Sequence, residues 1–334
     1  MFLYFFNRSR RSEAEYNGLH GMIAALRLLD RIPVQVRAML ALLVAVMLWG
    51  SSFMALKVAV AAFDPVVMIF GRMGCSLIVL LLLRVTLWRR SPQPLILDRR
   101  LAQRDWLFIV LLALCEPCFY FVFEGYGIQY TTASQAGMIV ATLPLAVVIA
   151  AWLLLGERPG LWVWVGFLLA VCGVVWLNWG AVATENAPNP VLGNCLEVLA
   201  MLCAAFYVIC AKQLSPVCAP VLVTTMQSVV GFLFFMPLLA LPVVNLPDSF
   251  PLLPSLAVVY LGAVVTLVSF LMYNFALRHA PASRVGAFLN LTPVFSLFFG
   301  MLFLDESLAP GQWAACALVL GGVVLSQKQT GEEV

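Results

Sequence analysis

TTASQAGMIVATLPLAVVIAAWLLLGERPGLWVWVGFLLAVCGVVWL, residues 131–177, decides the fold, because a second version of this stretch follows later in the chain. A shift of 149 residues, without a gap, places it on residues 280–326, and 12 of the 47 positions are identical. Three of the identities are leucines. The other identical residues are, in the first copy, Ala133, Ser134, Gly137, Pro144, Glu157, Trp164, Gly173, Val174 and Val175. The chain therefore contains an internal duplication.

The duplication extends toward the start of each half. A shift of 155 residues places Lys57 on Lys212 and residues 65–66 on residues 220–221. Many secondary transporters consist of two such repeats, with the substrate site between them. The pattern therefore favours a transporter, provided that the chain is a membrane protein.

The composition excludes an ordinary soluble domain. The chain is 63% hydrophobic and only 10% charged, whereas charged residues make up about a quarter of a soluble domain. The apolar residues form long blocks, unlike the alternating segments of about ten residues that barrel strands show. We therefore expect an all-α integral membrane protein in a lipid bilayer, with no nucleic acid partner.

The cysteines and histidines indicate no metal or redox site. Nine cysteines lie almost entirely inside apolar blocks, where they pack as small core residues. Cys115 and Cys118 form a CxxC pattern, but Pro117 and an apolar helix surround them, and the chain has only two histidines. We expect no metal, no cofactor and no catalytic residue.

Hydropathy predicts ten transmembrane helices, since a helix needs about 20 mostly apolar residues to cross the bilayer. The predicted spans are 38–60, 65–87, 106–127, 133–154, 161–179, 193–213, 220–241, 255–277, 284–304 and 310–327. They form two five-helix repeats, residues 37–180 and residues 190–328. We expect residues 1–36 to be a cytoplasmic N-terminal extension and residues 329–334 to be a cytoplasmic tail. The extension either contains a short interfacial helix at Met22–Leu29 or is a disordered or over-extended start, with Met22 as the true initiator.

The basic residues predict the orientation. Twelve of the 19 lie before the first span or around the loop at 84–104, and five more lie at later even-numbered connections or at the C-terminus. The connections near residues 62, 130, 185, 248 and 307 contain none. By the positive-inside rule, both termini face the cytoplasm. Five spans per half then make the repeats inverted, with Glu157 on the cytoplasmic side and Glu306 on the outer side.

Several motifs resemble one known family. The first half contains Trp49-Gly50-Ser51-Ser52-Phe53, followed by Lys57, Pro65 and Arg72. The ends of the repeats contain Tyr130-Thr131-Thr132-Ala133-Ser134, Pro144 and Gly156-Glu157-Arg158-Pro159, then Ala280-Pro281-Ala282-Ser283, Pro293 and Asp305-Glu306. Over residues 38–328 the chain thereby resembles the EamA family of the drug/metabolite transporter (DMT) superfamily.

The resemblance implies a ten-helix inner-membrane carrier, typically an exporter of amino acids or other small metabolites. The second half departs from the family pattern at two places. Ala204 and Ala205 stand where the first half has Trp49 and Gly50, and Gln227 stands in place of an arginine. The first two helices of the second half are therefore weaker candidates for a functional role.

Charged residues inside the spans are the sharpest functional candidates, because a charge at the bilayer centre costs about 2.5–3.5 kcal/mol. Lys57, Arg72, Glu124 and Glu197 lie in the outer half of their spans, where they either line one aqueous vestibule or pair among themselves. Arg72 is expected to form an ion pair or to contact an anionic substrate group. Lys57 can also extend toward the interface.

Glu116 lies near the predicted midplane, too deep to reach the interface. Its carboxyl group must therefore be protonated, ion-paired or in contact with water. We take Glu116 as the candidate proton carrier, with a hydrogen-bonded structural acid as the alternative. On a straight α-helix, Glu116 and Glu124 would lie about 80° apart, on one broad face.

Small and polar residues complete the candidate site. Gly50, Gly137 and Gly286 are expected to permit close helix packing. Pro144 and Pro293 occupy equivalent mid-span positions, where each proline frees a backbone carbonyl and can kink its helix. Further candidates on the substrate pathway are Trp49, Ser52, Gln135, Tyr273, Asn274 and Asn290. We expect spans one, three, four, six, eight and nine to surround a central polar cavity.

The duplication and the spans predict a secondary transporter that works by alternating access. The resemblance alone implies the inner (plasma) membrane and the export of small metabolites such as amino acids, with uptake as the alternative direction. The sequence contains no phosphate-binding G-x-x-x-x-G-K-[ST] motif, so the driving force would be a substrate gradient, protons or exchange rather than ATP. We expect a monomer or a homodimer. The substrate itself is not predicted.

Two other function classes remain as alternatives. The N-terminal extension leaves room for a non-transporting membrane sensor or partner protein. An integral membrane enzyme is less favoured, because the loops are short and the acidic residues are scattered rather than clustered at a membrane edge.

Overall fold

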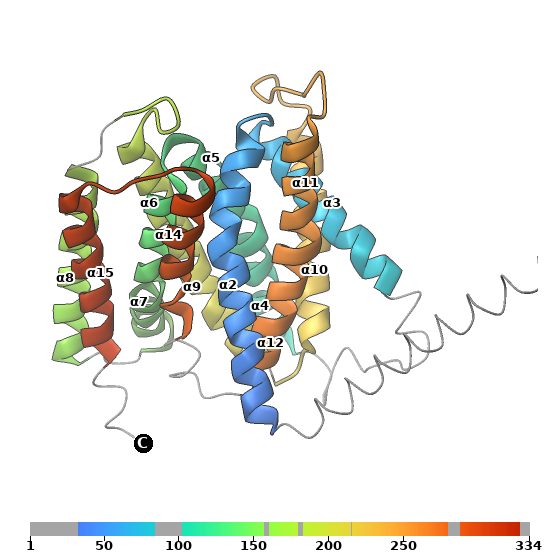
Figure 1. The fold of residues 1–334 in the computed structure, drawn as a ribbon. Coiled ribbons are helices and arrows are strands. Elements are labelled where there is room, and N and C mark those ends of the chain that lie inside the picture. Colours follow the sequence, from blue (N-terminus) through green and yellow to red (C-terminus); the bar gives the residue numbers. More distant parts are fainter. Residues whose placement is uncertain are drawn as a thin grey trace, which may run out of the picture.

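The apolar blocks fold into a bundle of helices in the computed structural model, which describes residues 33–83, 102–156, 160–179, 183–214, 216–279 and 288–327 (Figure 1). Within these ranges no strand occurs, and one isolated β-bridge pairs Thr184 with Ala187. The prediction of an all-α protein is therefore confirmed for the described residues.

The first half contains the helices α2 (Val34–Val60), α3 (Pro65–Leu83), α4 (Gln103–Ala113), η2 (Leu114–Phe119), α5 (Tyr120–Tyr130), α6 (Ala133–Ile139), η3 (Val140–Thr142), α7 (Leu143–Leu155) and α8 (Leu161–Trp179). The second half contains α9 (Pro190–Leu214), α10 (Pro220–Leu238), α11 (Leu252–Tyr260), η4 (Leu261–Ser269), α12 (Phe270–His279), α14 (Thr292–Phe303) and α15 (Pro310–Gln327). Here η2 and η4 are π-helical and η3 is a 3₁₀ turn.

Within the described residues, seven helical segments are long and apolar enough to cross a membrane. They are Val34–Val60, Pro65–Leu83, Gln103–Tyr130, Ala133–Leu154, Pro190–Leu214, Val221–Leu238 and Leu252–His279. Three further apolar helices are shorter: Leu161–Leu177, Thr292–Phe303 and Pro310–Leu325. The chain is therefore a multi-pass membrane protein. Each of the ten predicted spans overlaps one of these helices, but ten full crossings remain a prediction.

Prolines and one glycine set several helix boundaries. Helices α3, α9, α10 and α15 each have proline as their first residue, where the missing backbone N–H costs no hydrogen bond and the fixed φ suits a helix. Helix α7 ends at Gly156, whose φ of 71° is left-handed and so favours glycine.

Three of the predicted spans are interrupted beside a proline. In η2, Glu116 has non-helical angles (φ −145°, ψ 116°) directly before Pro117. The 3₁₀ turn η3 precedes Pro144, and a turn at Asn290 and Leu291 precedes Pro293. Proline removes a backbone donor and clashes with the carbonyl four residues earlier, which explains why the helices break there.

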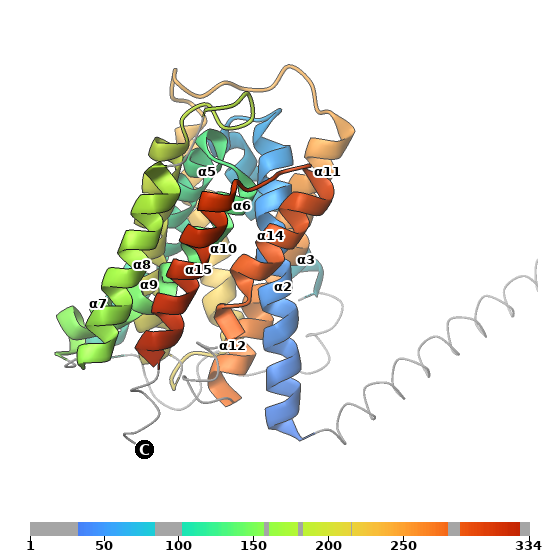
Figure 2. The same ribbon diagram turned by 60° about the vertical axis from the view of Figure 1, so that its left-hand side comes forward.

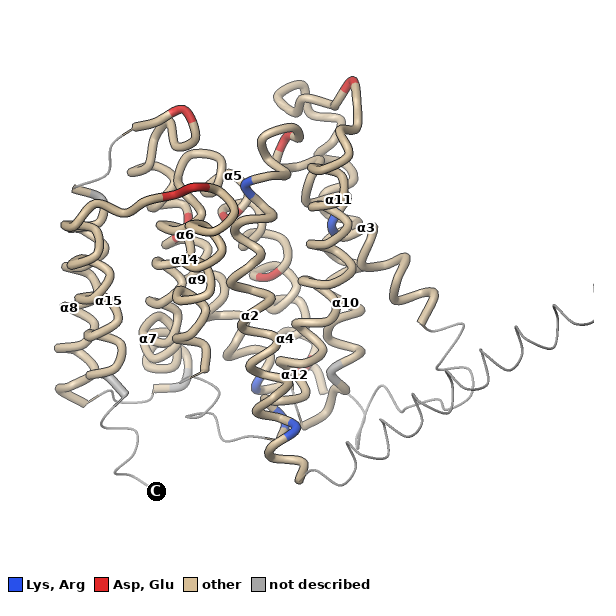
Figure 3. The backbone as a smooth tube through the Cα atoms, in the orientation of Figure 1, with Lys and Arg blue, Asp and Glu red and all other residues tan. Residues whose placement is uncertain are grey.

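The connections between helices place like charges at one end of the bundle. The end at the top of Figures 1 and 3 contains the connections after α2, α8, α10 and α14. It carries Asp64, Glu185, Asp248, Asp305 and Glu306, and we call it the acidic end. The start of α2 and the last turn of α15 both lie at the opposite end, whereas α9 begins at the acidic end.

Helices α8 and α15 form a closely packed pair at one side of the bundle (Figure 2). An ideal Cβ on Gly173 of α8 would lie 2.9 Å from the Ala315 carbonyl oxygen, and one on Gly322 of α15 would lie 2.5 Å from the Gly166 carbonyl oxygen. Gly173 and Gly322 are equivalent positions of the duplication. Both therefore permit the same close contact, as small residues do in membrane bundles.

Candidate functional site

A cavity lies among helices of both halves. Its volume of about 70 Å³ exceeds several-fold the roughly 10–15 Å³ that one water molecule requires by the same measure. The lining residues are Trp49, Ser52, Phe53, Arg72, Glu116, Tyr120, Phe121, Glu124, Val140, Leu143, Met201, Ala204, Tyr207, Val208, Phe270, Tyr273, Leu289 and Thr292. They come from the six spans that the sequence analysis expected, with Arg72 of α3 added.

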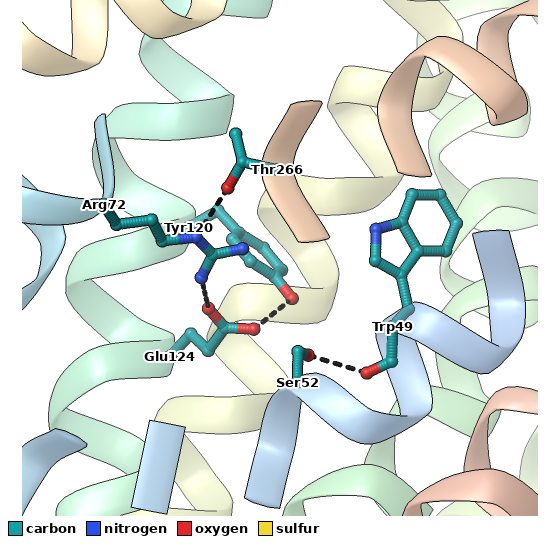
Figure 4. Close-up of polar contacts among 6 residues, drawn as sticks. All are labelled: Trp49, Ser52, Arg72, Tyr120, Glu124 and Thr266. Carbon is teal, nitrogen blue, oxygen red and sulfur yellow. Dashed lines mark hydrogen bonds and ion pairs between the residues drawn. The ribbon is translucent and has the colours of Figure 1, made fainter. Parts of the chain in front are cut away.

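Arg72 is the centre of a buried polar network (Figure 4). Its Nη1 lies 3.2 Å from Oε2 of Glu124, and its Nε donates to Oγ1 of Thr266 at 2.7 Å. The Tyr120 hydroxyl donates to the other Glu124 oxygen at 2.8 Å. The guanidinium carbon also lies 4.1 Å from the centre of the Phe121 ring, which allows a cation–π interaction. Of the two predicted roles for Arg72, the ion pair is therefore present.

An aromatic group forms another part of the wall. The centre of the Trp49 ring lies 5.4 Å from the ring centre of Phe270 and 5.0 Å from that of Tyr273. The ring centres of Phe270 and Tyr207 are 6.1 Å apart. Ser52 also lines the cavity, but its hydroxyl donates to the Trp49 carbonyl oxygen, 2.6 Å away, one turn earlier on α2 (Figure 4). The wall thus combines apolar and aromatic side chains with the charged groups of Arg72, Glu116 and Glu124 and with several hydroxyls.

Glu116 reaches the cavity from the broken segment η2. Its side chain is buried, and within the described residues its carboxyl group makes no hydrogen bond or ion pair. It lines the cavity together with Tyr207 and Tyr273. Because the helix is broken at Glu116, the 80° separation expected for a straight helix does not apply. Glu116 and Glu124 nevertheless line the same cavity.

Lys57 lies outside the cavity, near the acidic end. Its Nζ donates to the carbonyl oxygens of Ile128, at 2.8 Å, and of Thr131, at 2.6 Å. These carbonyls close the last turn of α5, where a cation interacts favourably with the helix dipole. The observed contacts of Lys57 are therefore those of a helix cap.

Gln135 also lies away from the cavity. Its Oε1 accepts from the Asn194 side-chain amide at 3.0 Å, and the Thr131 hydroxyl lies 2.7 Å from Asn194 Oδ1. This cluster connects the start of α6 with α9. Asn274 and Asn290 are likewise absent from the lining. The Asn274 amide nitrogen and the Asn290 amide oxygen are buried without a hydrogen-bond partner among the described residues.

The two described candidate packing glycines lie against α14. An ideal Cβ on Gly50 would lie 3.0 Å from the Ser296 nitrogen and 3.0 Å from the Thr292 carbonyl oxygen. A Cβ on Gly137 would overlap the Ser296 side chain. Gly286 lies outside the described residues.

Glu306 makes a contact between the two halves. Its carboxylate oxygens accept from the backbone nitrogens of Ala133 at 2.8 Å and Ser134 at 2.7 Å, the first two residues of α6. The amides at a helix N-terminus lack partners within the helix and favour a negative charge. Glu157, its equivalent in the duplication, lies outside the described residues.

The sequence analysis missed three residues that shape the site. Tyr120 lies four residues before Glu124, a spacing that brings side chains together on a helix, so it could have been recognised. Thr266 is 194 positions from its partner Arg72. Tyr207 lines the cavity from α9 and is buried. No local pattern points to either of these two residues.

The EamA-like transporter family matches this chain twice, over residues 36–179 and 191–327. The "Uncharacterized transporter YetK" of Bacillus subtilis (strain 168) is 30% identical over 302 residues, 88% of this chain and 89% of that protein. The "Probable terminal-alkyne amino-acid exporter" of Streptantibioticus cattleyicolor is 24% identical over 294 residues, 88% of this chain and 94% of the exporter.

A solved crystal structure has a similar fold. It is 19% identical in sequence, has a TM-score of 0.62, and covers 89% of this chain and 97% of its own. This likeness concerns the fold alone. The relatives named above are described as transporters, not as enzymes.

Proposed function

Since the chain belongs to the EamA-like transporter family, we propose that it exports small metabolites, such as amino acids or related compounds, across the inner (plasma) membrane. The observation that carries the proposal is the cavity lined by both halves of a multi-pass bundle. Substrate sites of duplicated carriers lie at such a boundary between repeats. The name of one relative, an amino-acid exporter, agrees with the substrate class.

The proposed architecture is ten membrane crossings in two inverted five-helix repeats, residues 37–180 and 190–328. Two observations support it: the family matches each half separately, and α2 and α9 begin at opposite ends of the bundle (Figures 1 and 2). The three shorter helices could cross a locally thinner bilayer or be completed by neighbouring residues.

We place the acidic end outside and both termini in the cytoplasm. The described basic residues apart from Lys57 and Arg72 lie near the other end, on α2, α4, α9 and α12 (Figure 3). This distribution agrees with the excess of lysine and arginine on the cytoplasmic side of membrane proteins.

Alternating access would open the cavity first to one side and then to the other. Inverted repeats favour this mechanism, because exchanging the conformations of the two halves yields the opposite-facing state. The helix breaks before Pro144 and Pro293 lie at equivalent positions of the halves, and such breaks are positions where a helix can bend. Glu116, buried without a partner among the described residues, is the proposed site for a coupling proton.

The proposal is tested by comparing the metabolites in the medium and cytosol of cells that overproduce the protein. Glu116→Gln removes a charge from the cavity, whereas Glu185→Gln removes one from a loop at the acidic end and serves as the matched control. We expect one class of compounds to appear in the medium with the wild-type and control proteins, and not with Glu116→Gln. An unchanged medium, with the wild-type protein verified in the membrane, would contradict export.

A further inference from the structure

The charges of the cavity do not balance. Among the described lining residues, the charged side chains are Arg72, Glu116 and Glu124, which carry one positive and two negative charges when ionised. Glu197 of α9 adds another acid outside the lining, fully buried and with no partner for either oxygen within the described residues. A ligand with one positive charge would neutralise the lining.

Arg72 is not free to receive an anionic ligand. Glu124, Thr266 and the face of Phe121 already hold its guanidinium group, and its side chain is only 3% exposed. A carboxylate ligand would have to displace Glu124 and leave a second buried acid without its partner. Lys57, the other cation of the outer half, is hydrogen-bonded to backbone carbonyls outside the cavity.

Glu116 has the opposite environment. It is 5% exposed, lines the cavity, and makes no hydrogen bond or ion pair with the described residues. A buried carboxylate without a partner is unfavourable in a membrane protein, and an ammonium group would satisfy it with charge-assisted hydrogen bonds. The carboxyl group therefore suits a cationic ligand better than an anionic one.

The aromatic wall suits the same ligand. Trp49, Tyr207 and Tyr273 line the same cavity as Glu116, and the ring centres of Trp49 and Tyr273 are 5.0 Å apart. Aromatic faces attract ammonium groups and also pack against apolar bodies. A ligand with an amine at one end and an apolar body would find a partner for each part.

We propose that the cavity selects singly charged cations, namely protonated amines or quaternary ammonium compounds with an apolar or aromatic body. The ammonium group lies at Glu116, and the body packs against Trp49 and Phe270. This inference rests on the proposed function in taking the cavity as the substrate site. It narrows the proposed metabolites to amines, because an amino acid would bring a carboxylate and the Arg72 guanidinium is already paired with Glu124.

The test measures binding of probes that share a phenyl body and differ in charge. The probes are 2-phenylethylammonium (cation), phenylalanine (zwitterion), 3-phenylpropionate (anion) and 2-phenylethanol (neutral), each titrated calorimetrically into the purified full-length chain in detergent. We expect the cation to bind about tenfold or more tightly than the alcohol, as a charge-assisted contact provides. The anion should bind most weakly.

Two variants of Glu116 assign the preference to its charge. Glu116→Gln should lower the affinity for the cation about tenfold and leave the affinity for the alcohol unchanged, which also shows that the cavity is intact. Glu116→Asp should keep the preference for the cation. Glu185→Gln, far from the cavity in sequence and at the acidic end, should behave as wild type.

The result separates this inference from the proposed function. Equal affinity for all probes, tighter binding of phenylalanine or phenylpropionate, or no binding of the cation overturns the cation preference. Transport of phenylalanine by reconstituted vesicles would then still support an exporter. Conversely, cation-selective binding that depends on Glu116, together with an unchanged medium in the metabolite comparison, would support the inference and contradict the proposed function.

Discussion

Arg72 and Glu124 show how a buried charge pair is held in a membrane protein. Each charge costs free energy to bury, and the pair is tolerated only when further hydrogen bonds satisfy both groups. Thr266 and Tyr120 supply these bonds from other positions of the bundle. The network therefore joins α3, α5 and η4 and shapes one wall of the cavity.

Removing only one member of this pair should destabilise the protein. Arg72→Met leaves the Glu124 carboxylate buried without its cation, and we expect a loss of about 3–5 kcal/mol in the free energy of unfolding. The double variant Arg72→Met/Glu124→Gln should recover much of this loss, because the uncharged glutamine amide needs no cation and its oxygen can still accept the hydrogen bond from the Tyr120 hydroxyl. The free energy of unfolding is measured for both variants in detergent. A single variant as stable as wild type would contradict the importance of the pair.

The contact of Glu306 with α6 should contribute a smaller amount. Glu306→Ala leaves the amides of Ala133 and Ser134 without their carboxylate, and loss of a helix cap costs about 0.5–2 kcal/mol. Glu185→Ala, an acid of another loop at the same end, provides the control. If the two variants unfold at the same temperature, the cap contributes nothing to stability.

At the scale of helices, close packing and breaks decide the architecture. Gly50 and Gly137 allow α2 and α6 to pack closely against α14. The space at these two positions is too small for any larger residue. The interruptions before Pro144 and Pro293 occur within the same group of helices. These elements surround the cavity, so their contacts decide whether it can change shape.

A large residue at Gly50 should impair transport without preventing membrane insertion. The side chain in Gly50→Leu would collide with Thr292 and Ser296, and overpacking costs about 1–3 kcal/mol. Gly321→Leu is the matched control, because nothing lies within 4 Å of an added Cβ there. Insertion is followed with a C-terminal reporter and transport with the exported compound. Full activity of Gly50→Leu would contradict the role of close packing.

The positions of the helices could be predicted from the sequence, but the faces that they present could not. Long apolar blocks identify membrane helices, and prolines such as Pro65 and Pro310 mark where helices begin. The partner of a side chain depends on how each helix is rotated about its own axis, which adjacent residues do not determine. Lys57 and Gln135 were expected on the substrate pathway because they are polar residues inside spans. The structure places both in contacts outside the cavity.

At the scale of the whole molecule, the duplication explains why the cavity lies where it does. Two similar halves that each contribute helices to one cavity leave the site at their boundary. The residues are not equivalent across that boundary, however. The first half contributes the three charged residues Arg72, Glu116 and Glu124, whereas the second half contributes aromatic and other uncharged residues. The duplication is visible in the sequence, but this asymmetry of the cavity appears only in the structure.

The proposed orientation predicts the location of reporters. A reporter that works only in the cytoplasm should be active when it is fused after residue 327. A reporter that works only outside the cytoplasm should be active when it is inserted near residue 245. Both follow from the excess of basic residues at the end opposite to the acidic end. The reverse pattern would show that the acidic end faces the cytoplasm.

The most direct test of the central claim uses purified protein in vesicles loaded with a mixture of amino acids and amines. Mass spectrometry then follows which compounds leave. We predict that one chemical class leaves wild-type and Glu185→Gln vesicles faster than empty vesicles, and that Glu116→Gln abolishes the difference. If no compound leaves faster than from empty vesicles, or if Glu116→Gln changes nothing, the cavity is not the path of a metabolite exporter.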